Sequence, residues 1–254
     1  LDEIFEGLGV NDLLGLRDKA PKITPEQLVL DRAALKAFVE SPMRVNHLTN
    51  DHAQTNLEKG VIEILYRDSG DLINIMSGLL ITKNGYFVTS HGLVDQLRES
   101  PLLIRTEDGK TYPIVKVCRY SAKNNIALAK ANISAPAKPM TYKFLERLDG
   151  SGNARITHMS RCDEKLKKRS GQIRDHRAFE FKIAGQDRKV HNQVSIQGFQ
   201  KSETVPGGVM STEYGEVYGI ASGFVQGQYG STCTSWEAVL DLIQGLVEGR
   251  GTKK

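Results

Sequence analysis

The stretch Ser77–Val94, with the sequence SGLLITKNGYFVTSHGLV, decides how the rest of this 254-residue chain is interpreted. An apolar run, Leu79–Ile81, leads to Asn84-Gly85, and a second apolar run, Tyr86–Val88, follows it. Asn-Gly between two apolar runs is a strong signal of a tight hairpin, because both turn residues tolerate positive φ. The alternation then stops, and apolar residues recur at helical spacing. The stretch therefore predicts a β-hairpin that runs directly into a short helix.

The composition is that of an ordinary soluble globular protein. Hydrophobic residues make up 39% of the chain and charged residues 25%, both close to the usual share. No apolar run approaches the roughly 18 residues of a membrane span, and the first residues lack a signal-peptide pattern. A formal net charge of +4 permits an anionic partner without requiring one. Because the chain begins with Leu1 rather than Met, we expect it to be a fragment or a processed product.

The three cysteines, Cys118, Cys162 and Cys233, are odd in number and far apart in the sequence. No pair of them has the spacing of a metal site, so we interpret them as free thiols in a reducing compartment. This interpretation places the protein inside the cell, in the cytoplasm. The chain also lacks a P-loop, a dinucleotide-binding glycine motif and any paired His, Cys or Asp spacing. We therefore expect no cofactor and no metal.

Residues 1–56 have a helical texture and are predicted to form an N-terminal extension. Its best-defined helix has Thr24 as N-cap, Pro25 as first residue, and ends before Pro42. The apolar stripe along this helix either packs on the rest of the chain or offers a docking surface to a partner, including a second copy of the chain.

From Gly60 onward, short strands alternate with Gly, Asn and Asp turns, a pattern typical of antiparallel barrels. Two prolines in Ser134–Pro139 mark a linker between two such units. The predicted segments are a first barrel at 57–136, a second barrel with a C-terminal helix (Ser235–Val247) at 137–248, and a tail at 249–254. The predicted strands are 61–66, 73–81, 86–89, 102–106, 111–119 and 126–131, then 154–159, 170–176, 178–183, 189–197, 204–210 and 216–222.

Three motifs occur in an order that matches a known family. The hairpin ends in TSHG at 89–92, a second motif reads NNIALAK at 124–130, and a third reads TVPGGV at 204–209, followed by GEVYGI at 215–220. Together they resemble the histidine, aspartate and serine segments of trypsin-like (chymotrypsin-fold) serine proteases of the HtrA/Deg type. The resemblance implies a mainly β fold: two antiparallel six-stranded β-barrels, with the helical extension before them and a helix at the C-terminus.

The resemblance places Gly92, Asn125 and Pro206 where the catalytic histidine, aspartate and serine would stand. Glycine has no side chain to act as a base, and an amide cannot stabilise an imidazolium as a carboxylate does. Proline has neither a hydroxyl nor a backbone N–H, so the nucleophile and one oxyanion donor are both missing. His91 stands one residue early, a displacement of about 100° around a helix axis. The sequence therefore predicts a pseudoprotease rather than an enzyme.

By the same resemblance, the scaffold keeps the edge of its cleft. A protein segment or extended peptide can add to such an edge as a strand, because this mode of binding uses backbone hydrogen bonds and needs no triad. We therefore predict a protein-binding or scaffolding module. The residues of the predicted edge are Gly219, Ile220, Ala221, Ser222 and Gly223.

Two alternatives stay open. The first is an active protease with a rebuilt site, whose candidate nucleophiles are Ser202, Ser211 and Cys233 and whose candidate bases are His91, His158, His176 and His191.

The second alternative is a nucleic-acid-associated module. Between residues 160 and 190 the chain carries ten Lys or Arg against five Asp or Glu, so this stretch either is a solvated loop or contacts phosphates or an acidic partner. Stacking aromatics are scarce there, which gives little support to sequence-specific RNA binding. The candidate contacts are Lys165, Lys167, Lys168, Arg169, Arg174 and Arg177.

Overall fold

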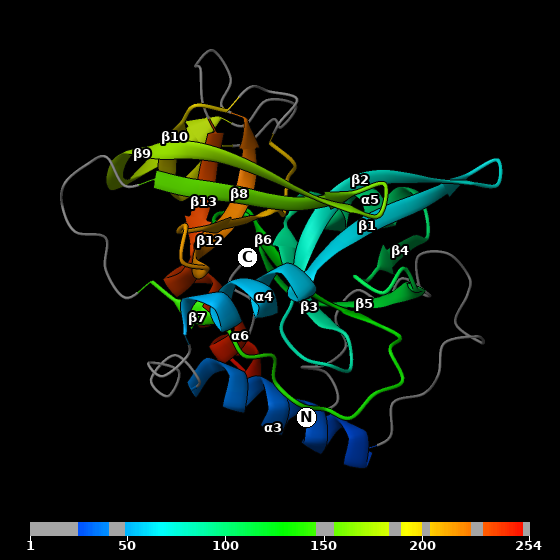
Figure 1. The fold of residues 1–254 in the computed structure, drawn as a ribbon. Helices are drawn as coiled ribbons and strands as arrows, with labels where there is room; N and C mark the ends of the chain where they lie inside the picture. Colours follow the sequence, from blue (N-terminus) through cyan, green and yellow to red (C-terminus); the bar gives the residue numbers. More distant parts are fainter. Residues whose placement is uncertain are drawn as a thin grey trace.

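The computed structural model describes residues 25–40, 49–145, 155–182, 189–199, 204–224 and 231–250. Two β-barrels lie side by side, and two long helices run beneath them (Figure 1). The helices are α3 (Pro25–Glu40), α4 (Asn50–Gly60), α5 (Gly92–Glu99) and α6 (Trp236–Val247). The strands are β1 (Val61–Asp68), β2 (Asp71–Leu80), β3 (Tyr86–Ser90), β4 (Leu102–Arg105), β5 (Thr111–Ser121), β6 (Ile126–Ala131), β7 (Lys143–Phe144), β8 (Arg155–Cys162), β9 (Lys165–Lys182), β10 (Lys189–Gln197), β11 (Val209–Ser211), β12 (Glu216–Phe224) and β13 (Ser231–Ser235).

The first barrel closes in the order β1-β2-β3-β6-β5-β4, with every pair antiparallel. The predicted β2–β3 hairpin forms, with Leu79 opposite Val88 and Leu80 opposite Phe87, so its connection is longer than the expected two-residue turn. At its turn only Gly85 takes a positive φ, of 101°. A Cβ on Gly85 would lie 2.4 Å from the carbonyl oxygen of Ala131, so this position needs glycine for both its conformation and its close approach. Local turn chemistry and barrel packing thus require the same residue.

The second barrel uses the order β11-β8-β9-β10-β13-β12 and closes where β11 pairs with β12. β7 adds to its outside as a parallel partner of β12. Its interior holds an apolar cluster that includes Ile156, Ile173, Ile196 and Met210. The predicted fold class, a mainly β fold of two six-stranded antiparallel barrels with flanking helices, is therefore confirmed.

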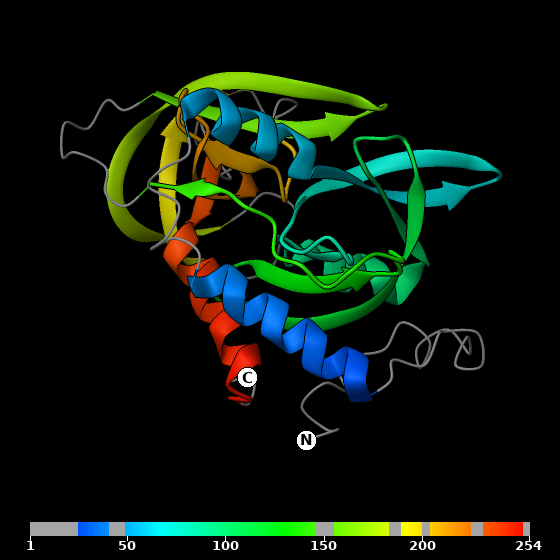
Figure 2. The same ribbon diagram turned by 60° about the horizontal axis from the view of Figure 1, so that its bottom comes forward.

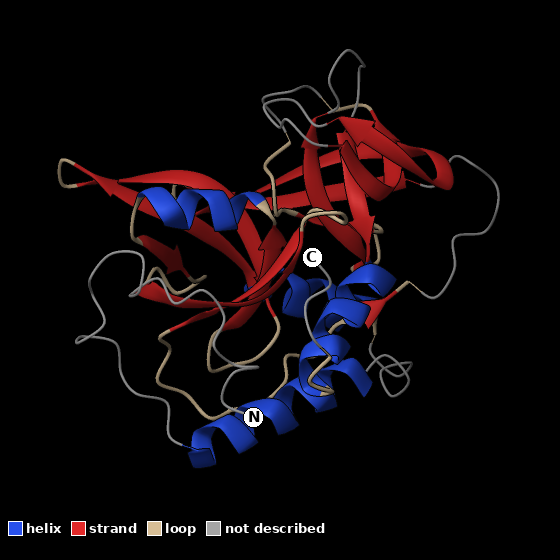
Figure 3. Cartoon of the chain, turned by 180° about the vertical axis from the view of Figure 1, so that it is seen from behind, coloured by secondary structure: helices blue, strands red, loops and turns tan. Residues whose placement is uncertain are grey.

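The helix α3 lies at the outer edge of the molecule and packs beside α6 (Figures 2 and 3). Its Phe38 is fully buried and meets Trp236 of α6 edge to face, with ring centroids 6.1 Å apart. Nε of Arg32 donates to the carbonyl of Val247, at the end of α6. Most of the stripe that the sequence offered for docking is therefore used within the chain, while Val29 and Leu30 stay exposed.

A buried charged side chain, Asp31, fastens α3 to the first barrel. Its carboxylate accepts hydrogen bonds from Nδ2 of Asn84 at 2.6 Å and from the hydroxyl of Tyr86 at 2.9 Å. Nζ of Lys130 lies 2.5 Å from the same carboxylate and 4.2 Å from the centre of the Tyr86 ring. Burial raises the pKa of Tyr86, so its hydroxyl stays a donor. Buried charges persist only when they are paired and hydrogen-bonded, as here.

Arg161 joins the two barrels. Its guanidinium, on β8, donates to the carbonyls of Val61 and Glu58 on the first-barrel side, each at 3.1 Å, and to that of Glu164 in its own barrel. Its backbone N–H donates to Oγ of Ser77 on β2 at 3.0 Å. The arginine guanidinium has five N–H donors in a fixed planar arrangement, which allows it to bond to several carbonyls at once.

Several elements differ from the sequence-based expectation. One strand, β9, spans the two strands predicted at 170–176 and 178–183, because it pairs with β8 along its first part and with β10 along its second. The strand predicted at 204–210 is confined to β11, and α4 and β13 were not predicted. The basic run that begins at Lys165 lies in β9 rather than in a loop. The predicted helical segment before Pro25 falls outside the described residues, and the domain boundaries stay a prediction.

Candidate cleft between the barrels

The three positions singled out in the sequence lie at one place between the barrels. Gly92 and Pro206 line the same cavity, of about 350 Å³, although they are 114 positions apart in the chain. Asn125 lies fully buried beside it, with its carbonyl oxygen accepting the N–H of His91 at 3.1 Å. The cavity is lined by Ile75 and Met76 of β2, Ser90 of β3, Gly92 and Gln96 of α5, and Pro206 from the loop before β11.

Gly92 is the first residue of α5, and its missing side chain leaves space at the cavity. A Cβ at this position would lie 3.2 Å from Cε of Met76 and 3.7 Å from Oγ of Ser90, and its φ is not in the left-handed region. The backbone would therefore accept a side chain here, if Met76 gave way by a few tenths of an ångström. The place where the resemblance expects a base is empty.

His91 lies away from this cavity, as its displacement by one residue predicts. Its ring packs edge to face on Tyr120, with centroids 5.2 Å apart. Its Nδ1 lies 3.8 Å from a carboxylate oxygen of Asp95, one helical turn further on. The imidazole is buried and absent from the cavity lining, so it is not placed to serve a nucleophile there.

The side chain of Asn125 donates a hydrogen bond to the second barrel. Its φ of 55° is left-handed, a conformation that Asn tolerates better than most residues. Its Nδ2 donates to the carbonyl of Ser222 at 3.2 Å. A carboxylate cannot donate this bond, so the amide suits its surroundings better than the aspartate of the resemblance would.

The loop Thr204–Gly208 is packed so closely that its two glycines are required. A Cβ on Gly207 would lie 2.0 Å from the carbonyl oxygen of Ser77, and one on Gly208 would lie 2.3 Å from Nε2 of His158. Both N–H groups are bonded within the chain, that of Gly207 to Ala221 at 2.8 Å and that of Gly208 to Val205 at 3.1 Å. Neither is free to hold an oxyanion.

His158, one of the candidate bases, has a structural contact with this loop. Its Nε2 lies 3.2 Å from the carbonyl oxygen of Val205, and its ring packs on Phe199. Burial lowers the pKa of His158 to about 4, with the hydrogen bond to Val205 acting in the opposite direction. The imidazole is therefore neutral near pH 7, and its Nε2–H donates a hydrogen bond to the carbonyl, which holds the loop in place.

The other members of the rebuilt-site alternative do not form a pair. Oγ of Ser211 is buried without a hydrogen-bond partner, and burial raises the pKa of the Cys233 thiol, which keeps it protonated and unreactive. In the described part of the chain, neither group bonds to a histidine. Ser202 and the side chains of His176 and His191 lie outside the described residues.

The predicted peptide edge is open over a shorter length than expected. Gly219 and Ile220 pair with β11 on one side and with β13 on the other. Ala221 already exchanges backbone hydrogen bonds with Gly207 and Gly208. Beyond Ser222, whose carbonyl accepts from Asn125, Gly223 pairs with β13, and the described residues supply no strand on its other side. Most of the predicted edge is therefore already paired, and its last residues, Ser222 and Gly223, are buried.

The basic residues at the start of β9 are exposed, but they are not equivalent. Nζ of Lys168 lies 2.6 Å from the Glu58 carboxylate, so its charge is already partly neutralised. Lys165, Lys167 and Arg169 alternate with it along the strand and are exposed. The side chains of Arg174 and Arg177 lie outside the described residues.

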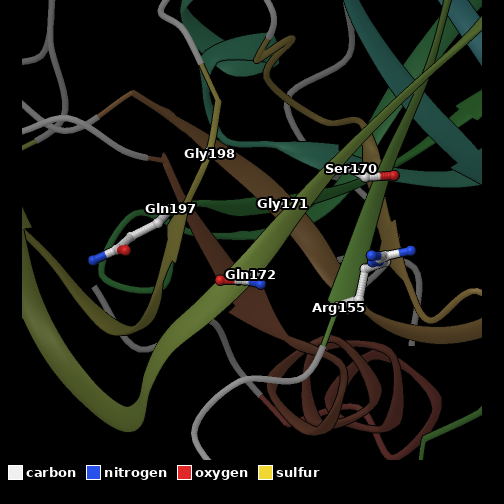
Figure 4. Close-up of a pocket in the computed structure, with 6 residues that line it drawn as sticks. All are labelled: Arg155, Ser170, Gly171, Gln172, Gln197 and Gly198. Atoms are coloured by element: carbon white, nitrogen blue, oxygen red, sulfur yellow. The ribbon is translucent and has the colours of Figure 1, made fainter.

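A second cavity, of about 540 Å³, lies where β8, β9 and the end of β10 meet, away from the three positions above (Figure 4). The side chains of Arg155 and Gln197 point away from each other there. A Cβ on Gly171 would lie 2.4 Å from the carbonyl oxygen of Gln197, so the strands approach closely at this point. The polar groups do not converge on one spot, and we do not assign the cavity a ligand.

All three cysteines are free thiols in the structure, two of them buried. Across the ranges that the structure describes, no group of three or more His, Cys, Asp or Glu side chains is arranged to hold a metal ion. Within the same ranges, none of the helices has the length and apolar character needed to span a bilayer.

Two closed six-stranded antiparallel barrels, with a cleft between them and a helix at the C-terminus, define the trypsin-like (chymotrypsin) fold. The protease domain of MamO from Magnetospirillum magneticum, solved in its apo form, is similar, with a TM-score of 0.59 and 14% identity, over 73% of this chain and 96% of that domain. In all, 666 chains of known structure match, so the likeness establishes a widely used fold and does not by itself indicate a function. No family model matches the sequence, and no curated protein matches it.

Proposed function

We propose that this chain is a catalytically inactive trypsin-like domain, of the HtrA/Deg type, that binds a protein segment in extended form. The observation that carries the proposal is that Gly92 and Pro206 line one cavity, with Asn125 beside it. The scaffold's cleft is present, while the residues at these positions supply neither a base, nor a carboxylate, nor a nucleophile. Acyl chemistry of the triad type needs those groups, whereas strand addition does not.

The end of β12 is where we place the bound segment. Asn125 fixes the carbonyl of Ser222, and Oγ of Ser222 donates to the buried side chain of Gln193 at 2.5 Å. Gln193 in turn donates to Oγ1 of Thr234 on β13 at 2.9 Å. This network holds the strand end rigid. A peptide that pairs beyond Ser222 therefore meets a preorganised edge, and the protein loses less conformational entropy on binding.

Chemical probes test the inactive state. We expect neither a fluorophosphonate nor a thiol-directed inhibitor probe to label the cleft of the native chain, and a denatured protein substrate to stay intact. Pro206→Ser serves as a matched variant, because it restores a hydroxyl without a base and is expected to stay unlabelled. An active trypsin-like protease is the positive control. Labelling of a serine, or probe-sensitive cleavage of the substrate, overturns the proposal in favour of the rebuilt site.

Backbone methylation of the ligand tests the binding mode. Because successive N–H groups of a strand point to opposite sides, methylating alternate nitrogens in one register removes all the bonds to β12, while the other register spares them. The test uses a peptide selected from an unstructured peptide library. We expect this peptide to lose binding when the nitrogens of one register are methylated and to keep it when those of the other register are. Equal loss in both registers, or no peptide binding above background, contradicts strand addition.

An anionic partner is a second candidate, favoured by the exposed alternation of Lys165, Lys167 and Arg169 on β9. Side chains two residues apart on a strand lie roughly 6–7 Å from each other, so such a row follows a linear polyanion. Binding of single-stranded oligonucleotide is expected to fall steeply with salt and to weaken in Lys167→Glu more than in Lys36→Glu on α3. Affinity that does not change with salt excludes this candidate.

A further inference from the structure

The cavity at Gly92, of about 350 Å³, has room for a side chain and a lining that suits one. Its walls combine apolar groups, from Ile75, Met76 and Pro206, with two hydrogen-bonding side chains, Ser90 and Gln96. Among the residues that the structure describes, no charged side chain lines it. A lining of this kind favours an uncharged group with an apolar stem, because a charge would lose its hydration there without gaining a partner.

The hydroxyl of Ser90 gives the pocket a polar end that the fold leaves unused. The side chain is only 1% exposed, and its Oγ has no hydrogen-bond partner. It lies 3.7 Å from where a Cβ on Gly92 would be, so it faces the space that the missing side chain leaves. A buried hydroxyl without a partner costs free energy, and a ligand group that bonds to it recovers that cost on binding.

The pocket adjoins the end of β12. Asn125 bonds through its carbonyl to the N–H of His91, next to Gly92, and through Nδ2 to the carbonyl of Ser222. Gly207, next to Pro206, bonds to Ala221. Both walls of the pocket are thus one residue away from groups bonded to β12, and a peptide paired with the end of β12 passes its mouth.

We infer that the cavity at Gly92 is a specificity pocket that takes one uncharged hydrogen-bonding side chain, of the glutamine or asparagine class, from the bound peptide. The inference rests on the proposed peptide binding and adds what the peptide must contain. The apolar stem packs on Met76 and Pro206, and the amide meets Oγ of Ser90 with Gln96 at the mouth. Glu and Lys are excluded because their charge has no partner among the lining groups.

A positional-scanning library of capped hexapeptides, with each position fixed in turn as Gln, Asn, Leu, Glu, Lys or Gly, tests the inference by fluorescence anisotropy. We expect one position at which Gln or Asn binds about tenfold better than Leu, as one additional hydrogen bond to a buried group provides, and Glu and Lys to bind worst. Gly92→Leu fills the pocket and should abolish this preference while leaving the other positions unchanged.

Ser90→Ala is the second variant. It removes only an unpaired buried hydroxyl and is expected to fold normally, so it keeps the test valid if Gly92→Leu does not fold. Gln should then bind no better than Leu. A preference unchanged in Ser90→Ala, or a preference for Leu or for a charged side chain in the native chain, overturns the pocket. Peptide binding that is sensitive to backbone methylation but indifferent to Gly92→Leu would leave strand addition standing and refute the pocket alone, whereas no binding of any peptide refutes both.

Discussion

Removing the carboxylate of Asp31 should detach α3 from the first barrel. In Asp31→Ala the Lys130 ammonium, in a residue only 8% exposed, loses its ion-pair partner while staying among buried groups. Nδ2 of Asn84 and the hydroxyl of Tyr86 lose their acceptor at the same time. Breaking a buried pair by removing one partner typically costs about 3–5 kcal/mol. The urea midpoint should therefore fall by about 1–2 M, for an m value of ~2–3 kcal/mol/M.

The single tryptophan of the chain reports on this detachment directly. Trp236 lies on α6 and contacts Phe38 of α3, so its fluorescence should change as soon as α3 leaves. Far-ultraviolet circular dichroism, by contrast, follows the barrels and helices together. We expect the two transitions to coincide in the native chain and the fluorescence transition to come first in Asp31→Ala.

Two variants make the result interpretable. Glu40→Ala breaks an exposed pair on the same helix, in which the Lys36 Nζ lies 3.8 Å from the carboxylate, and should cost at most about 1 kcal/mol. Asp31→Leu combined with Lys130→Met removes both charges and should recover most of the loss, as for other buried pairs replaced by apolar residues. An Asp31→Ala midpoint no lower than that of Glu40→Ala would refute the account of how α3 is held.

Four further predictions follow from single contacts. Because the pKa of His158 is lowered in the folded chain, the unfolded chain binds a proton first as the pH falls from 6.5 to 4. The free energy of unfolding should therefore decrease over that window by up to roughly 3 kcal/mol. This decrease should be absent in His158→Gln. Asn125→Asp replaces the donor to Ser222 by a buried acceptor and should lower the unfolding free energy by about 1–3 kcal/mol. A thiol reagent should modify only Cys162 in the native chain and all three cysteines in urea, because the other two thiols are buried. If the exposed end of α3 joins two copies, Leu30→Glu should lower the mass measured by light scattering.

Each of these has a control on the same chain. Substituting His52, which is exposed, should leave the acid profile unchanged, and a profile equally altered by both substitutions would contradict the role of His158. Asn132→Asp, at an exposed position, is the counterpart for Asn125→Asp, and equal stability of the two variants would argue against the bond to Ser222. Rapid modification of a second thiol in the native chain would contradict the burial of Cys118 and Cys233. A mass that is the same for Leu30→Glu and the native chain would leave α3 without a role in association.

Local patterns in the sequence predicted the elements whose own residues determine them. The hairpin and helix within Ser77–Val94 formed as expected, because the Gly85 turn and the two apolar runs favour the same structure. The strand β13 was missed because its sequence, STCTS, is small and polar, and its burial comes from β10 and β12 on either side. The helix α4 was missed because it buries little apolar surface beyond Ala53 and Leu57.

The site was predictable only in part for the same reason. The order of three motifs placed Gly92, Asn125 and Pro206 together, but nothing local shows that Asn125 bonds to a residue 97 positions further on. A usable signal was present for Asp31, which shares a helix face with Leu35 and Phe38 at spacings of four and seven residues. A charge at such a position predicts a buried partner, and Lys130 within an apolar strand was the matching candidate.

The two hydrogen bonds from Arg161 to carbonyls on the first-barrel side have a consequence for the rate at which the proposed peptide binds. Because these bonds keep the two barrels at a fixed separation, no domain motion has to precede binding of a peptide between them. Stopped-flow traces should then show one exponential whose rate climbs in proportion to ligand concentration without levelling off. In Arg161→Met the observed rate should instead reach a plateau at high ligand concentration, because a slow motion of the barrels then limits binding.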